Sequence, residues 1–107
     1  MAEVVYTIEG TTKDGKKVEL TVKLKKFCKC KPSHPNCQKD AEPILEKKVK
    51  KLLSEIESKD LFWLENRVNP NFFVKVMEAV TEAMETVCIT ARSDHLQGAE
   101  VLVKEIT

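Results

Sequence analysis

Apolar and polar residues alternate in two stretches near the N-terminus, which is the pattern of half-buried β-strands. Residues 3–9 place Val4, Tyr6 and Ile8 on one face. In residues 18–25 the corresponding apolar positions are Val18, Leu20, Val22 and Leu24. Between the two stretches, Asp14-Gly15 is a strong turn signal, because glycine adopts positive φ without a Cβ clash. The pattern predicts a β-hairpin.

Two later segments carry apolar residues at helical spacing. In the first, Asp40 is suited to cap a helix and Pro43 fits its first turn. Its apolar stripe consists of Leu45, Val49, Leu52, Leu53 and Ile56. The second begins at Asn69-Pro70, and its stripe consists of Phe73, Val76, Met77, Val80, Met84 and Val87. Because the two segments are similar in length, they predict a helix hairpin that runs out and back.

The C-terminal part returns to alternation in residues 86–92, and residues 99–106 are rich in Val, Leu and Ile. The predicted class is therefore α+β in the order ββ-αα-ββ, with a four-stranded antiparallel sheet and the helix hairpin on one face. Residues 1–107 are expected to form a single domain. The predicted core contains Leu20, Val22, Leu52, Val76, Val80 and Ile89.

Composition narrows the functional classes. The net charge of +1 gives the whole chain no attraction to nucleic acid or acidic membranes, and no apolar run approaches the roughly 18 residues of a membrane span. With only three glycines there is no phosphate-binding loop, and no carboxylate pair lies in an apolar context, so an enzyme is not expected. The N-terminus lacks a signal-peptide pattern, which favours the cytoplasm, with secretion as the alternative.

Four cysteines carry the only distinctive chemistry. Cys28, Cys30 and Cys37 share one loop, and Cys88 opens the predicted third strand. An out-and-back helix hairpin should return the chain to the end of the sheet that holds this loop. Four thiolates at one point suit tetrahedral zinc, and the neighbouring lysines favour the thiolate form. The main hypothesis is therefore a non-enzymatic zinc domain, with these four cysteines as ligands, that binds another protein.

The loop Cys28-Lys-Cys30-Lys-Pro-Ser-His34-Pro-Asn-Cys37 has the spacing C-x-C-x6-C. It resembles the C-x-C-x4-C zinc loop that follows the catalytic domain of SET-type lysine methyltransferases. The resemblance covers ten residues and implies no methyltransferase activity. The same loop resembles part of the iron–sulfur motif of CDGSH proteins, but the ligand histidine after the third cysteine is absent, so no cluster is predicted. His34 is a further possible ligand, although an exposed histidine is the simpler interpretation.

The alternative for the cysteines is two disulfides in an extracellular binding domain, most simply Cys30–Cys37 with Cys28–Cys88. Four cysteines allow three pairings, and the sequence does not choose between them. Two further alternatives are a basic-faced nucleic-acid binder and an engineered scaffold, which the locally consistent lysine- and glutamate-rich elements also suit.

A nucleic-acid platform would use the sheet face that the helices leave open. Its predicted members are Thr21, Lys23, Lys25, Thr90, Arg92 and Lys104. This role is disfavoured because aromatic residues for base stacking are lacking there. Ser93-Asp94-His95 is assigned to turn chemistry, since consecutive residues do not align as a catalytic triad. Exposure of Trp63 or Phe72 would instead mark a protein-contact site.

Overall fold

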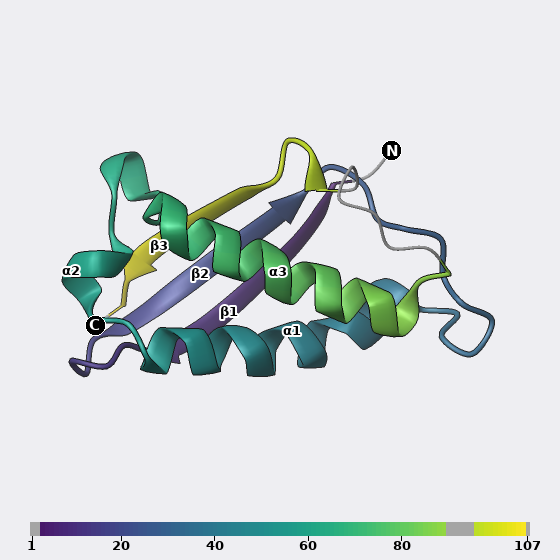
Figure 1. Ribbon diagram of the computed structural model, residues 1–107, viewed down its shortest axis with the longest axis horizontal. Coiled ribbons are helices and arrows are strands. Elements are labelled where there is room, and N and C mark those ends of the chain that lie inside the picture. Colours follow the sequence, from purple (N-terminus) through teal and green to yellow (C-terminus); the bar gives the residue numbers. More distant parts are fainter. Residues whose placement is uncertain (1–2, 90–95, 107) are drawn as a thin grey trace.

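The computed structural model describes residues 3–89 and 96–106. In chain order the elements are β1 (Val4–Thr11), β2 (Lys17–Leu24), α1 (Cys37–Ser54), α2 (Ser58–Leu61), the 3-10 turn η1 (Leu64–Asn66), α3 (Pro70–Val87) and β3 (Glu100–Glu105). The strands form an antiparallel sheet in the order β1-β2-β3. Both long helices, α1 and α3, lie across one face of this sheet (Figure 1). None of the described helices combines the length and apolar composition that crossing a membrane requires.

The N-terminal hairpin forms as predicted. Val4 lies opposite Leu24 and Thr11 opposite Lys17, and Gly15 adopts φ 85° in the turn. Every second residue of these two strands faces the helices, and all of these residues except half-buried Gly10 are buried, so the period-2 pattern sets which side of the sheet is covered.

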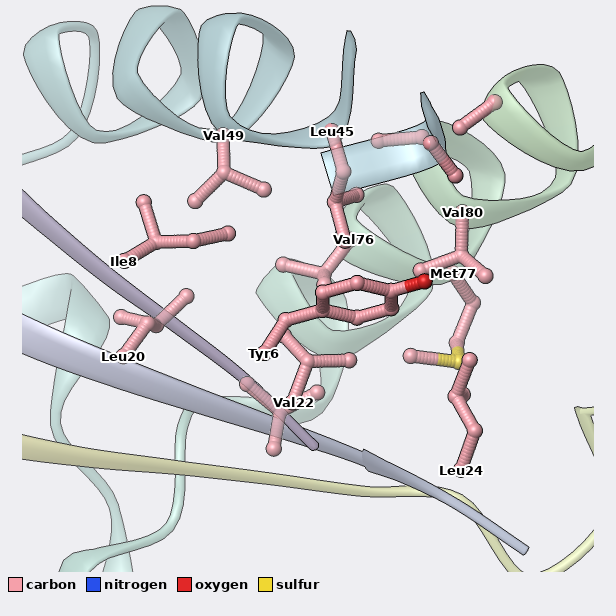
Figure 2. Packing of buried hydrophobic residues seen from close by; sticks show 14 of the residues in the cluster. Tyr6, Ile8, Leu20, Val22, Leu24, Leu45, Val49, Val76, Met77 and Val80 are labelled. Carbon is pink, nitrogen blue, oxygen red and sulfur yellow. The ribbon is translucent and has the colours of Figure 1, made fainter. Parts of the chain in front are cut away.

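The core lies between the sheet and the two helices (Figure 2). Its largest fully buried side chains come from every layer: Phe72, Ile8, Leu20, Leu24, Leu45, Leu53, Leu61, Met84, Val18, Val22, Val49 and Val76. α1 packs tightly against β1 at Gly10, where an added Cβ would lie 2.5 Å from Leu53 Cδ1. Because Leu53 is itself fully buried, the missing side chain of Gly10 permits this close approach.

The predicted four-stranded sheet is wrong. The described part of the chain contains a three-stranded sheet, and the first two residues of the segment expected to form the additional strand, Thr86 and Val87, instead end α3. The physical reason is that Val76, Val80 and Val87 continue one helical stripe. The short alternation over residues 86–92 is the weaker signal. Asn69 caps α3 as predicted, with its side chain accepting the Asn71 N–H at 2.9 Å.

Two members of the predicted core are also misplaced. Ile89 is 51% exposed, because it follows the end of α3 and does not enter the sheet. Leu52 is only half-buried, and Leu53 takes the fully buried position instead. α1 begins at Cys37, ahead of the predicted cap Asp40, and includes Pro43. Its buried stripe therefore starts about two turns before Leu45, with Cys37 and Ala41.

Some sequence predictions fall on residues outside the described ranges. These are the last three residues of the strand predicted over residues 86–92, the placement of Thr90 and Arg92 on the open sheet face and the turn assigned to Ser93-Asp94-His95.

Asp14 fastens the hairpin turn to α2. Its carboxylate accepts the Ser58 hydroxyl at 2.6 Å, the Thr12 hydroxyl at 2.6 Å and the Ser58 N–H at 2.9 Å. These hydrogen bonds, the one from the Ser58 side chain first, hold the pKa of Asp14 well below its ordinary value. The turn therefore serves as an anchor for the start of α2 as well as a connection between strands.

Gly10→Ala should lower the free energy of unfolding by about 1–3 kcal/mol, because the new methyl group overpacks the contact with Leu53. Urea denaturation followed by far-UV circular dichroism measures the change. Thr11→Ala is the matched control at an exposed neighbouring position and should stay within about 0.5 kcal/mol of the unchanged protein. Equal stability of the two variants would show that α1 is not seated against β1 as described.

The stabilising effect of Asp14 should depend on pH. Its pKa is lower in the folded than in the unfolded chain, so the ionised carboxylate stabilises the fold above the unfolded pKa of about 3.9. This contribution is lost as the pH falls from about 5 through the folded pKa. The difference in unfolding free energy between the unchanged protein and Asp14→Asn should therefore shrink between pH 6 and pH 2. A difference that stays constant over that range would contradict this assignment.

Candidate functional site

All four cysteines meet at one end of the molecule as two disulfides. Cys28 pairs with Cys88 across 60 residues, with 5.8 Å between their Cα atoms. Cys30 pairs with Cys37 across seven residues, with a Cα–Cα distance of 5.3 Å. Both separations lie in the normal range for disulfides. Of the three possible pairings, this is the one that the sequence analysis named as simplest.

The predicted zinc site is therefore wrong. Cys28, Cys30, Cys37 and Cys88 are consumed in disulfides, and a disulfide sulfur is not the thiolate that zinc binds. Within residues 3–89 and 96–106, no group of three or more His, Cys, Asp or Glu side chains is arranged to hold a metal ion. The zinc hypothesis and its cofactor assignment give way to the disulfide alternative.

Backbone pairing holds the disulfides in place. Cys30 and Cys88 lie opposite each other in an antiparallel bridge. The Ile89 N–H donates to the Lys29 carbonyl at 2.8 Å, and the Lys31 N–H donates to the Val87 carbonyl at 3.0 Å. Hydrogen bonds thus join the chain after β2 to the end of α3, in addition to the Cys28–Cys88 bond.

The loop inside the Cys30–Cys37 disulfide is closed by polar contacts. The His34 N–H donates to the Lys31 carbonyl at 2.9 Å, and His34 Nδ1 lies 3.0 Å from Asp40 Oδ2 in the first turn of α1. His34 is therefore a structural contact of the loop rather than a metal ligand. Cys37 is the first residue of α1 and is buried, so this disulfide fixes where the helix begins.

The second feature is the sheet face that the helices leave uncovered. Paired residues of an antiparallel sheet project from the same face. Thr7 lies opposite Thr21, and Thr21 opposite Leu102, so these three side chains form a row across the open face. Arg67, from the segment between α2 and α3, lies opposite Leu102 in an isolated antiparallel bridge. The row thus extends past the edge of β3.

Trp63 continues the row. Phe62 and Val68 face each other in an antiparallel bridge, and the Trp63 N–H donates to the Arg67 carbonyl at 2.8 Å. Since successive residues of a strand alternate faces and Val68 is buried, Trp63 and Arg67 project to the opposite, open side. Trp63 is 56% exposed, whereas Phe72, the other aromatic singled out in the sequence, is buried.

The turn that carries Trp63 has unusual backbone geometry. Glu65 and Asn66 are consecutive non-glycine residues at φ 53° and 63°. Such left-handed residues are costly and persist where the surrounding structure holds them. Here the holding contacts are the Arg67 N–H to Leu64 carbonyl bond at 3.0 Å and the bridge to Leu102. Trp63 and the neighbouring Leu64, which is 71% exposed, therefore lie on a turn whose conformation these contacts fix.

The open face is close to charge-balanced. Its ionisable side chains on the strands, together with Arg67, are four basic and three acidic: Lys17, Lys23, Lys104, Arg67, Glu9, Glu19 and Glu100. Two opposite pairs lie close together, with Lys104 Nζ 3.5 Å from Glu19 and Arg67 Nη2 3.9 Å from Glu100. An excess of one positive charge gives the face little field to attract a phosphate backbone.

Comparisons with known proteins return no match to a protein-family model, to a curated protein or to a solved structure.

Sequence reasoning identified Trp63 as a conditional contact site but missed Arg67 and Leu102. Arg67 lies in an irregular segment with no strand pattern, and its place beside β3 follows from a single bridge. The available signal was the run Phe62-Trp63-Leu64, in which three large apolar residues precede a polar turn.

A reductant should destabilise the protein, and a chelator should leave its stability unchanged. Cys30–Cys37 should open first because Cys30 is half-buried, whereas both sulfurs of Cys28–Cys88 are buried. Stepwise reduction, alkylation of the released thiols and peptide mass spectrometry give the order. Loss of stability on adding a chelator, or release of Cys28 and Cys88 first, would contradict this assignment.

Double variants provide the control. In the chain-entropy account, removing the 60-residue link with Cys28→Ala and Cys88→Ala should cost about 4 kcal/mol. Removing the seven-residue link with Cys30→Ser and Cys37→Ser should cost about 2.5 kcal/mol. The longer link should therefore be the more destabilising to lose.

Proposed function

We propose that this chain is a non-enzymatic, disulfide-stabilised domain that binds another protein through its open sheet face and works in an oxidising, extracellular compartment. The observation that carries the proposal is a row of side chains that crosses the sheet and ends in an exposed tryptophan on a turn of fixed conformation. The row consists of Thr7, Thr21, Leu102, Arg67 and Trp63.

The chemistry of this row suits a protein partner. Tryptophan and arginine are the residue types that most often supply binding energy at the centre of protein interfaces. Trp63 and Arg67 are neighbours here, and half-buried Leu102 adds an apolar surface beside them. Nearly balanced charges on the face provide a polar rim, whereas nucleic acid would call for a strongly basic one.

The compartment follows from the cysteines. Stable disulfides persist outside the reducing cytosol, and a small domain gains much of its stability from them. Since all four cysteines are paired, the secreted alternative replaces the cytoplasmic location expected from the N-terminal sequence.

Trp63→Ser should abolish partner binding without unfolding the domain. The immobilised protein is incubated with the secreted-protein fraction of the cells that make it, and retained proteins are quantified by mass spectrometry. Proteins retained by the unchanged domain should fall at least tenfold with Trp63→Ser or Arg67→Ser. Because Trp63 and Arg67 are exposed, both variants should keep unfolding free energies within about 0.5 kcal/mol of the original.

Val74→Ser is the matched control, because Val74 is 54% exposed but lies on α3, on the other side of the sheet. It should retain the same proteins as the unchanged domain. Trp63 is the only tryptophan of the chain, so its emission should shift to shorter wavelength when a purified partner is added. Equal capture by all variants, or an unchanged emission spectrum, would refute the proposal.

A further inference from the structure

The two edge strands of the sheet differ in whether another segment pairs with their outer side. At β3, Arg67 lies opposite Leu102 and occupies part of the edge. At β1, no segment of residues 3–89 or 96–106 pairs with the outer side of the strand. β1 spans eight residues and contains neither lysine nor proline, the residues that commonly protect an exposed edge.

Hydrogen-bond alternation shows which groups this edge presents. The Ile106 N–H donates to the Lys17 carbonyl at 2.9 Å, so Lys17 directs its backbone toward β3 and not toward Thr11. Bonded and non-bonded pairs alternate along an antiparallel ladder. Thr11, Glu9, Thr7 and Val5 consequently point their N–H and C=O groups away from β2, and their side chains are exposed.

The border of this edge is acidic by one charge, with three glutamates against two lysines. Glu42, Glu46 and Lys50 follow one another at four-residue spacing along one flank of α1. That flank faces β1, because Lys50 lines a groove of about 480 Å³ together with Glu9 of β1 and Lys17 of β2. Lys50 Nζ is paired with Glu46 at 3.0 Å, whereas Glu9 and Glu42 form no ion pair with any residue that the structure describes.

The surroundings of Tyr6 show that Glu42 lies close to β1. The Tyr6 hydroxyl donates to the Gln38 carbonyl at 2.9 Å, which ties β1 to the first turns of α1. Burial, and after it the negative charge of Glu42, raises the pKa of Tyr6 to about 12. Glu42 therefore lies near enough to β1 to act on a group of that strand.

A second copy of the chain does not fit this edge. α1 lies against β1, with Val49 directed toward Ile8 (Figure 2) and Leu53 against Gly10. Two copies joined antiparallel through β1 would place both α1 helices on the same face. Both helices, each about 10 Å wide, would then have to pack on neighbouring strands only about 4.8 Å apart. A lone extended segment carries no such helix and avoids the collision.

We infer that the β1 edge binds an extended, basic segment of a partner protein, which adds a fourth strand beside β1 and places lysine or arginine side chains near Glu9 and Glu42. Main-chain hydrogen bonds to Val5, Thr7 and Glu9 supply the pairing, and the acidic border selects the charge. The site lies at the edge opposite Trp63 and does not depend on the function proposed for the open face.

The test uses two acetylated and amidated octapeptides, one of alternating Lys and Thr and one of alternating Glu and Thr. Backbone amide exchange of the disulfide-intact protein is followed by NMR. Without peptide, the amides of Val5, Thr7 and Glu9 should exchange quickly at every protein concentration. The Lys-Thr peptide should slow their exchange at least tenfold, and the Glu-Thr peptide should leave it unchanged.

Two variants separate the backbone and charge contributions. Thr7→Pro removes an outward N–H and should weaken Lys-Thr peptide binding at least tenfold, whereas Thr7→Ser keeps the N–H and should bind as before. If Thr7→Pro does not fold, the double variant Glu9→Gln with Glu42→Gln still tests the site, and it should weaken binding at least fivefold.

Several outcomes would overturn the inference. Slow exchange of Val5, Thr7 and Glu9 without peptide, independent of concentration, would mean that the chain itself covers the edge. Protection that grows with protein concentration would mean that a second copy occupies it. Equal binding of both peptides would show that charge does not select the partner segment. No binding of the Lys-Thr peptide would show that the β1 edge is not a binding site for such a segment.

Discussion

The Cys28–Cys88 bond is the constraint on which the arrangement of the molecule depends. It joins the end of the hairpin to the end of α3 and encloses all three helices in one covalent loop. Cys30–Cys37 then fixes the start of α1 within that loop. The two disulfides thus hold α1 and α3 at the same end of the sheet. The apolar stripes of these two helices cover one face of the sheet and leave the opposite face open.

The open face and the exposed edge both follow from the two long helices and three strands that the described residues form. The two helices lie side by side on the inner face and bury the inward residues of the strands, except half-buried Gly10 and exposed Glu105 at strand ends. No described helix covers the outer face (Figure 1). The turn around Trp63 extends this face beyond β3, whereas on the other side no described segment pairs with the outer edge of β1. One sheet therefore offers two different surfaces, a side-chain row and a main-chain edge.

Local patterns in the sequence were enough for the elements whose signals are short-range. Alternation and Asp14-Gly15 predicted the hairpin, and helical stripes with Asn69-Pro70 predicted two long helices and the start of α3. These patterns predicted the wrong element where the strand period and the helix period both fit the same residues. Val87 fits both a strand beginning at residue 86 and the stripe of α3, and packing against the sheet decided for the helix.

The sequence by itself determined the hairpin, the helix stripes and the presence of four cysteines near a turn-rich loop, because each is written in neighbouring residues. Only the tertiary structure decided the chemistry of those cysteines, since zinc and disulfides need the same residues and differ in how the sulfurs meet. It also decided the open-face row, because Thr7, Thr21, Leu102, Arg67 and Trp63 become neighbours through strand pairing. Pairing across distant segments depends on the whole core, and no local pattern encodes it.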